Sequence, residues 1–296
     1  MPFEIFFQLA VSGLTTGAVY SLIALGFITI YRASNILNLA QGEFVMLGAL
    51  CAVFFIEKFG LSYFHAAVSS VLLVSLVGII LQRAVIHPIR DEPILILIMV
   101  TIGLSMFMSG GAGVLFGHSP QSLPPIIDIP SFEIFGSVRI NTQSFFVIGT
   151  TLLLVLILYG LSRYTFIGKA MEAVSTDRLG SDLTGIPGNF IIMLSFGISA
   201  GIGAIAGIFI TPLFFTQYNS GAILGLKGFS AAVIGGWGKY SGAVLGGFIL
   251  GVVESVSVGF IPAGYKDAIA FIVLLLILYF KPKGILGSRA LEESRK

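Results

Sequence analysis

The chain has 296 residues, of which 56% are hydrophobic and only 10% are charged, and its mean hydropathy is +1.02. This composition is typical of a chain that buries apolar segments in lipid, so we expect an all-α polytopic membrane protein. The net charge of +2 is too small, and the basic residues too scattered, to indicate nucleic-acid binding. A single cysteine, Cys51, excludes an intrachain disulfide and a thiolate metal cluster.

Long uncharged runs predict the membrane spans. Five runs contain no Asp, Glu, Lys or Arg: 5–31, 59–82, 94–127, 140–162 and 189–226. Three shorter runs are also mainly apolar: 44–56, 242–261 and 268–280. A helical span needs about 20 apolar residues, so the short runs cross only with their flanks or as broken or re-entrant segments. We expect eight or nine crossings, the first retained because its run is too long for a signal peptide.

The first break in the apolar pattern is YRASNILNLAQGEFVMLG, residues 31–48. Asn35, Asn38 and Gln41 recur every three residues, so successive side chains drift by about 60° around a helix and cannot all share one face. A helix end followed by a break at Gly42 would let some of these groups line a cavity. Helix caps and loop hydrogen bonds explain the same residues equally well. Glu43, in the same stretch, is a further candidate for a transport pathway or gate.

A proline-containing loop, residues 118–141, is the longest connection predicted on the outer side. Its alternating residues 132–140 predict a short hairpin or a surface helix. The loop either receives an external partner or is a solvated connector.

Residues 162–188, SRYTFIGKAMEAVSTDRLGSDLTGIPG, form the most conspicuous polar interruption between two apolar runs. We call them the 162–188 loop. A protein that moves a solute across a membrane needs a source of energy. It has either an ion-binding site among its helices or a surface to which a soluble, energy-supplying partner binds. We therefore predict that this loop is a docking surface.

The distribution of basic residues predicts the orientation. If the 162–188 loop is cytoplasmic, twelve of the sixteen basic residues lie on that side and four, Lys58, Arg139, Lys227 and Lys266, lie opposite. The positive-inside rule favours this arrangement. The C-terminal tail, residues 281–296, is then cytoplasmic, and the N-terminus is expected outside unless a re-entrant segment reverses it.

Pairs of glycines four residues apart predict close helix packing. They are Gly13/Gly17, Gly113/Gly117, Gly197/Gly201, Gly203/Gly207, Gly242/Gly246 and Gly247/Gly251. Such seams let helix backbones approach in lipid. They predict a dense bundle within the chain, with an interface to a second subunit as the alternative.

The second break is a glycine-rich bend, residues 235–242, before an apolar helix that carries Glu254. A carboxylate in such a run is costly and must face the bundle interior or find a partner. Glu254 is expected either to hydrogen-bond a neighbouring helix or to serve the pathway or its gate. The GGWGK string is not a phosphate loop, because the required earlier glycine is missing and Tyr240 replaces Ser or Thr.

Enzymatic interpretations find little support. The three histidines, His65, His87 and His118, lack zinc-ligand spacing, and no G-x-S-x-G turn is present. Glu254 is the only convincing ionisable residue predicted inside a span, which disfavours an ion-driven carrier. We expect no enzyme activity and an external source of energy.

Four segments carry a family resemblance that extends over nearly the whole chain. They are GLTTGAVYSLIALGFITIYRASNILNLAQGEFVMLGA at 13–49, GKAMEAVSTDRLGSDLTGI at 168–186, GLKGFSAAVIGGWGKYSGAVLGGFILGVVES at 225–255 and YKDAIAFIVLLLILYFKPKGILG at 265–287. In this order and spacing, the chain resembles the permease subunits of bacterial branched-chain amino acid ABC importers, specifically the H-type permease of the LIV system.

The resemblance implies a single permease domain over residues 1–296 in the bacterial inner membrane. It implies a second related permease, two cytoplasmic ATPase subunits and a periplasmic or surface-tethered binding protein as partners. No cofactor is expected in this chain, and ATP and magnesium belong to the ATPases. The substrate is expected to be a branched-chain amino acid, with other amino acids, urea or amides as alternatives. A carrier or an intramembrane scaffold would be the remaining classes.

The resemblance also makes the 162–188 loop the coupling segment. Residues 168–178 are expected to form a short amphipathic helix in a groove of the ATPase, with Met171 and Val174 as apolar contacts. The residues expected to couple are Gly168, Lys169, Ala170, Met171, Glu172, Ala173, Val174, Asp177, Arg178, Gly185 and Ile186. Gly180 and Ser181 replace the family's usual alanines, so we expect the second half to be less helical.

Overall fold

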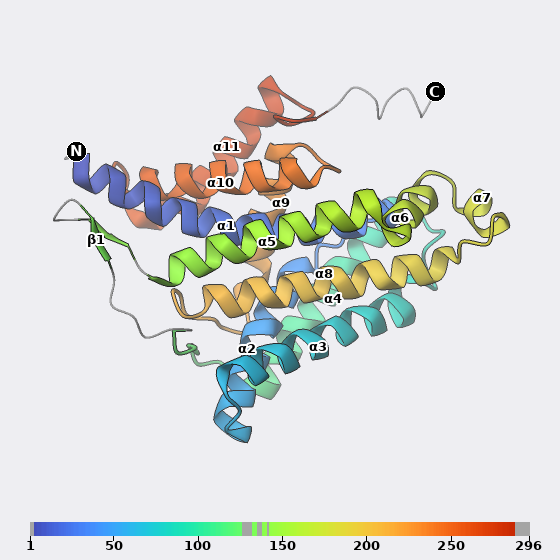
Figure 1. Cartoon of the computed structure of the whole chain (residues 1–296), viewed down its shortest axis with the longest axis horizontal. Coiled ribbons are helices and arrows are strands. Elements are labelled where there is room, and N and C mark those ends of the chain that lie inside the picture. Colours follow the sequence, from blue (N-terminus) through green and yellow to red (C-terminus); the bar gives the residue numbers. More distant parts are fainter. Residues whose placement is uncertain (1–2, 126–131, 135–137, 141, 288–296) are drawn as a thin grey trace. The chain divides into compact units, whose positions relative to one another are not determined.

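The computed structural model describes residues 3–125, 132–134, 138–140 and 142–287 (Figure 1). The chain forms two compact units by its internal contacts. The first unit contains residues 1–28, 127–155 and 227–296, and the second contains residues 29–126 and 156–226. The division falls within the helices α1 (Phe3–Ser34), α5 (Thr142–Tyr164) and α9 (Ser220–Gly235).

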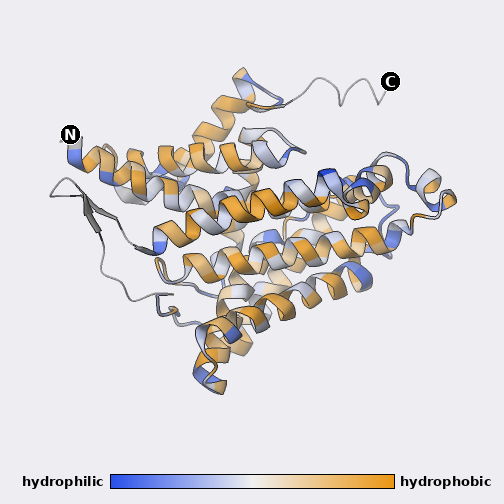
Figure 2. Ribbon diagram, in the orientation of Figure 1, coloured by the Kyte–Doolittle hydropathy of each residue, from blue (hydrophilic) through white to orange (hydrophobic). Residues whose placement is uncertain are grey.

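Six helices in the described residues are long and apolar enough to cross a membrane. They are α1, α3 (Tyr63–Leu81) with the π-helical turn η1 (Gln82–Ile86), α4 (Ile94–Phe116), α5, α8 (Gly188–Ile210) and α10 (Tyr240–Ser257). Hydrophobic residues cover most of their length, and hydrophilic ones gather near helix ends and in connections (Figure 2). The helices α2 (Gln41–Phe59), α9 and α11 (Lys266–Phe280) are shorter or carry more charge. The sequence predicted eight or nine crossings, whereas six helices in the described residues meet these criteria.

In the second unit, α8 is the central helix and packs against α2 and α3. Its glycines face both neighbours. A Cβ at Gly207 would lie 1.9 Å from the Val45 oxygen of α2, and a Cβ at Gly201 would lie 2.7 Å from Ser75 Oγ of α3. The buried share is 78% for the α8 span and only 17% for α4. Small residues therefore let α8 occupy the interior, while α4 presents apolar side chains to lipid.

In the first unit, glycines bring α1 and α10 together. A Cβ at Gly17 would lie 2.8 Å from the Gly247 oxygen, and one at Gly251 would lie 2.3 Å from the Gly17 nitrogen. Ser21 reinforces the contact by donating a hydrogen bond to the Val244 oxygen at 3.0 Å. The predicted small-residue seams are therefore used for packing within the chain.

The break after α1 lies earlier than the sequence predicted. Helix α1 ends at Ser34, and Asn35 has a positive φ of 57°, a left-handed conformation that Asn tolerates better than most residues. Helix α2 begins at Gln41, so Gly42 lies inside its first turn. The expected break at Gly42 is corrected to residues 35–40, because an Asn ends the helix.

The loop 118–141 contains a short antiparallel hairpin, which was predicted as the alternative to a surface helix. Strands β1 (Phe132–Ile134) and β2 (Val138–Ile140) pair with Glu133 opposite Arg139. Earlier in the loop, Gln121 exchanges two backbone hydrogen bonds of 2.9 Å with Thr216. Residues 126–131, 135–137 and 141 lie outside the described residues.

The start of the C-terminal tail packs against the glycine-rich bend of the first unit. Ile285 and Leu286 donate backbone hydrogen bonds of 2.9 Å to Ile234 and Gly235, and Lys239 Nζ donates to the Leu286 oxygen at 2.8 Å. A short 3₁₀ turn, η2 (Ala263–Tyr265), precedes α11. The rest of the predicted tail, residues 288–296, lies outside the described residues.

Candidate functional site

The 162–188 loop folds into two short helices, α6 (Phe166–Thr176) and α7 (Arg178–Leu183). Each begins at a side-chain cap: Thr165 Oγ1 accepts a hydrogen bond from the Gly168 nitrogen at 3.2 Å, and Asp177 Oδ1 accepts one from the Gly180 nitrogen at 3.0 Å. Thr and Asp at such positions satisfy free N–H groups of the first turn. The expectation of a less helical second half is wrong, because the chain breaks only at Asp177 and caps a new helix there.

Helix α7 ends at the Gly-Ile pair that the resemblance singled out. Gly185 has φ of 85°, its N–H bonds the Asp182 oxygen at 3.1 Å, and the Ile186 N–H bonds the Ser181 oxygen at 2.9 Å. These two bonds form a Schellman motif, which favours glycine at the left-handed position and an apolar residue after it. Ile186 packs at the edge of a buried cluster, so the pair fixes where the segment returns to α8.

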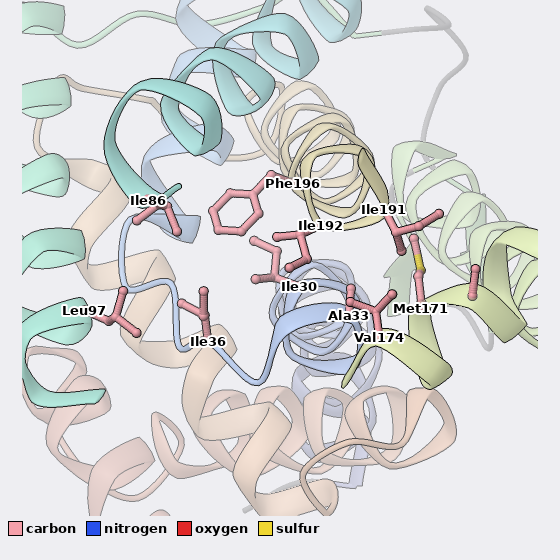
Figure 3. Close-up of a cluster of buried hydrophobic side chains, with 11 residues drawn as sticks. Ile30, Ala33, Ile36, Ile86, Leu97, Met171, Val174, Ile191, Ile192 and Phe196 are labelled. Atoms are coloured by element: carbon pink, nitrogen blue, oxygen red, sulfur yellow. The ribbon is translucent and has the colours of Figure 1, made fainter. Parts of the chain in front are cut away.

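The apolar face of α6 is buried inside the second unit. Ala170, Met171 and Val174 are 1%, 2% and 4% exposed and belong to a cluster with the end of α1 and the start of α8. Figure 3 shows Met171 and Val174 beside Ile191 and Ala33. The expectation that Met171 and Val174 supply contacts to a partner is therefore wrong, because the chain's own core already covers them.

The exposed side of the 162–188 loop carries charged and large apolar side chains. Lys169 and Glu172 are exposed, Ala173 is half-buried, and Glu172 lies 3.9 Å from Arg32. Three large apolar side chains also face solvent: Phe166, Leu179 and Leu183, at 68%, 78% and 88% exposure. The two leucines lie four residues apart on α7, so they share one helix face. An exposed apolar face outside the candidate spans is a feature of interaction surfaces.

A cationic cluster lies beside the α6–α7 junction. Arg90 and Arg178 both donate to Asn189 Oδ1, and Asp91 lies 3.3 Å from Arg90 and 3.9 Å from Arg178. Partial desolvation lowers the pKa of the Arg178 guanidinium, and the Arg90 charge adds to that effect. Desolvation and the neighbouring arginines likewise lower the pKa of His87, to which Arg90 Nη1 approaches within 2.9 Å.

The polar residues around the α1–α2 break lie in different environments. Asn35 is exposed and donates to the Ser175 oxygen at 2.7 Å, which ties the end of α1 to the end of α6. Asn38 is buried, and its Oδ1 accepts from the Ala40 nitrogen at 3.2 Å. Gln41 exchanges two hydrogen bonds with Ser199 in α8, at 2.7 and 3.2 Å. These residues therefore act as a helix-end tie, a loop cap and an interhelical link.

Glu43 has a different environment. It is 1% exposed, and its Oε1 accepts a hydrogen bond from Ser105 Oγ of α4 at 2.8 Å. Its Oε2 is buried and has no hydrogen-bond partner among the described residues; an added Cβ at Gly221 would lie 2.2 Å from it. In the described part of the chain no basic side chain pairs with it. A buried carboxylate satisfied on one oxygen only is a candidate functional group in a membrane protein.

Glu254 lies in a buried ionic cluster of the first unit. Lys227 Nζ of α9 lies 2.7 Å from Glu254 Oε1 and 2.7 Å from Asp267 Oδ1 of α11. Tyr20 of α1 donates to Glu254 Oε2 at 2.9 Å and accepts from Lys227 Nζ at 3.1 Å. Both oxygens of Glu254 are therefore satisfied, and one cluster joins four helices.

Lys227 is the residue that sequence reasoning misplaced. It was expected in a loop, but it is 4% exposed within α9. The signal was present, since Lys227 stands between apolar and glycine residues on both sides, but its carboxylate partners lie 27 and 40 positions later in the chain (254 and 267 minus 227). Lys227 and Glu43 are as deeply buried as Glu254, although their helices α9 and α2 are not among the six candidate spans.

Comparisons with known proteins agree over almost the whole chain. A family model described as branched-chain amino acid transport system, permease component, matches residues 9–278. The chain is 32% identical to the high-affinity branched-chain amino acid transport system permease protein LivH of Salmonella typhimurium, over 98% of each chain. It is 32% identical to BraD of Pseudomonas aeruginosa, covering 97% of this chain and 98% of that one. Among solved structures it is similar to PsaBC from Streptococcus pneumoniae in complex with Fab, with 18% identity, coverage of 95% of this chain and 91% of that one, and a TM-score of 0.44.

Proposed function

We propose a function from one premise: the chain belongs to the branched-chain amino acid transport system permease family. It is thus a multi-pass transport permease subunit rather than an enzyme. We infer that it imports branched-chain amino acids and forms the translocation pathway with a second related permease. The observation that carries this proposal is the 32% identity to LivH over 98% of both chains.

The partners and the energy source follow from the same proposal. Two cytoplasmic ATPase subunits bind ATP and magnesium, and a periplasmic or surface-tethered binding protein delivers the substrate. The chain acts as a single permease domain in the bacterial inner membrane, with its C-terminus in the cytoplasm. The uneven distribution of basic residues supports this orientation. Lys227 no longer counts as a loop residue, which leaves three of the four basic residues assigned to the outer side.

The ATPase would grip the exposed face of the 162–188 loop. The burial of Met171 and Val174 fixes α6 to the core of the second unit, so a push on the outer face is transmitted to α8 and the end of α1. Leu179, Leu183 and Phe166 would supply the apolar contact. Lys169 and Glu172 would lie around it.

The test replaces Ala173 with Arg. Ala173 is half-buried on α6, so a long side chain can leave the core intact while it blocks close docking. We expect ATP-driven uptake of branched-chain amino acids to fall at least about tenfold, a loss of about 1.4 kcal/mol or more in coupling. Membrane insertion, measured by the amount of folded protein in the membrane fraction, should not change.

A matched Ala→Arg control is available outside the segment. Ala84 is exposed in η1, and Ala84→Arg should keep uptake near the wild-type level. Unchanged uptake in Ala173→Arg would remove the coupling role of the segment. Equal loss in both variants would also contradict it, since the effect would then not be specific to α6.

A further inference from the structure

A cavity of about 270 Å³ lies in the second unit, where the end of α1, the turn η1 and the α6–α7 junction meet. Its residues come from 33–36, from 82–91, from 174–178 and from α8. Typical pockets for drug-sized ligands measure about 300–1,000 Å³, so this one suits a smaller molecule.

One side of the cavity is aliphatic. Ile36, Ile86, Val174 and Ile192 line it, and all four are buried. Branched side chains of this kind form a wall that favours an apolar body without aromatic stacking. They also belong to the cluster of Figure 3, so the wall is held by the packed core.

A buried amide also lines this space. Gln82 lines the cavity and is 3% exposed, yet its side chain makes no hydrogen bond with any residue that the structure describes. An amide carries two donors and an acceptor. The amide of Gln82 is therefore available to hydrogen-bond a polar group of an occupant.

The charged residues of the lining favour an anion. Arg90, Arg178 and Asp91 line the cavity, which gives two positive charges against one negative. The two guanidinium groups converge on Asn189 Oδ1, and Asp91 is turned outward, with its side chain 84% exposed. Each guanidinium has five donors in a fork that suits a carboxylate, so several remain available.

We propose that this cavity binds a small aliphatic carboxylate. The carboxylate lies between Arg90 and Arg178, the branched body lies against Ile36, Ile86 and Val174, and the Gln82 amide donates a hydrogen bond to the ligand. An amino acid such as leucine would place its ammonium near the C-terminal end of α1, where the helix dipole favours a cation. A carboxylate without an amine would use the same arginines.

The site would act on the 162–188 loop. Val174 and Arg178 belong to α6 and α7, whereas Ile36, Gln82 and Arg90 come from other segments of the same unit. An occupant therefore joins the α6–α7 junction to the end of α1 and to η1. Binding would resist movement of this junction, whatever substrate the protein transports.

A single native cysteine makes the site directly testable. In a Cys51→Ala background, Ser175→Cys places a thiol in the cavity lining, and Thr176→Cys places one on the neighbouring exposed residue. The full-length protein, in nanodiscs with its co-purifying subunits, is alkylated with a small thiol reagent in the presence of leucine, isovalerate, isopentylamine or chloride. Ser34→Cys is a second reporter from the same lining.

We expect leucine or isovalerate to slow alkylation of Ser175→Cys about tenfold once its concentration reaches about ten times its Kd, because only the empty cavity reacts. Thr176→Cys should react unchanged, and Gln82→Leu should raise the half-protecting concentration about tenfold. If leucine protects the thiol and isovalerate does not, the ligand is an amino acid. If leucine and isovalerate both protect it, a carboxylate is sufficient for binding. Protection by isopentylamine or chloride to the same degree, or by no compound at either reporter, overturns the proposal.

Discussion

At the residue scale, Glu254 and Glu43 have both lost nearly all contact with water, at 5% and 1% exposure. Taking a carboxylate out of water costs several kcal/mol unless a partner and hydrogen bonds replace the solvent. Glu254 has Lys227 on one oxygen and Tyr20 on the other. Among the residues that the structure describes, Glu43 has Ser105 as its one side-chain partner. The structure therefore supports a structural role for Glu254 and leaves Glu43 as the stronger candidate for a pathway or gate.

The role of Glu254 can be tested through its partner. Lys227→Met leaves a buried carboxylate held only by Tyr20, so we expect a loss of about 3–5 kcal/mol in the free energy of unfolding. The double variant Lys227→Met/Glu254→Gln keeps the Tyr20 hydrogen bond and removes the charge, so it should recover most of that loss. Thermal unfolding of the purified protein measures both.

The control for this pair is Lys266→Met, because Lys266 precedes Asp267 in the chain but is exposed. It should change stability by less than about 0.5 kcal/mol, as most surface substitutions do. A double variant no more stable than Lys227→Met alone would show that the ionic cluster does not account for the burial of Glu254.

Glu43→Gln tests the candidate pathway group. An amide removes a buried charge that has no cation, so the free energy of unfolding should stay the same or rise by about 1 kcal/mol. If Glu43 serves the pathway or its gate, substrate uptake should nevertheless fall at least about tenfold. Glu57→Gln, at the exposed end of the same helix, should leave both unchanged. Normal uptake by Glu43→Gln would assign Glu43 a structural role.

At the element scale, the two-helix form of the 162–188 loop depends on Asp177. Asp177→Ala removes the cap of α7 and should cost about 1 kcal/mol locally, whereas Asp177→Asn should cost little because Asn caps equally well. Hydrogen exchange of the amides of residues 178–183 should speed up in Asp177→Ala only. Equal exchange in all three proteins would show that α7 does not need its cap.

How far the sequence predicts these elements depends on where their partners lie. The family resemblance predicted an amphipathic helix over 168–178, and α6 confirms a helix over most of that stretch, up to Thr176. Which way its apolar face points was not predictable, because Ile191, Phe196 and Ile30 come from helices distant in the chain. The break at Asn35 was missed for a related reason: the left-handed conformation of Asn35 is stabilised by the Ser175 carbonyl, 140 positions away.

At the scale of the whole molecule, composition and uncharged runs predicted a polytopic helical membrane protein, and the structure and the family confirm it. Periodic glycines predicted close helix packing, since small residues act locally on one helix face. The pairing of Lys227 with two carboxylates was not predicted, because ion pairs across a bundle depend on tertiary positions.

The central claim is that ATP hydrolysis by partner subunits drives import through this chain. The most direct measurement is uptake of radiolabelled leucine into proteoliposomes that contain the chain with its partner permease and ATPases. We predict accumulation only when ATP and the binding protein are both supplied, and a fall of at least about tenfold when either is omitted. Leucine uptake by this chain alone, driven by an ion gradient without ATPase subunits, would contradict the account.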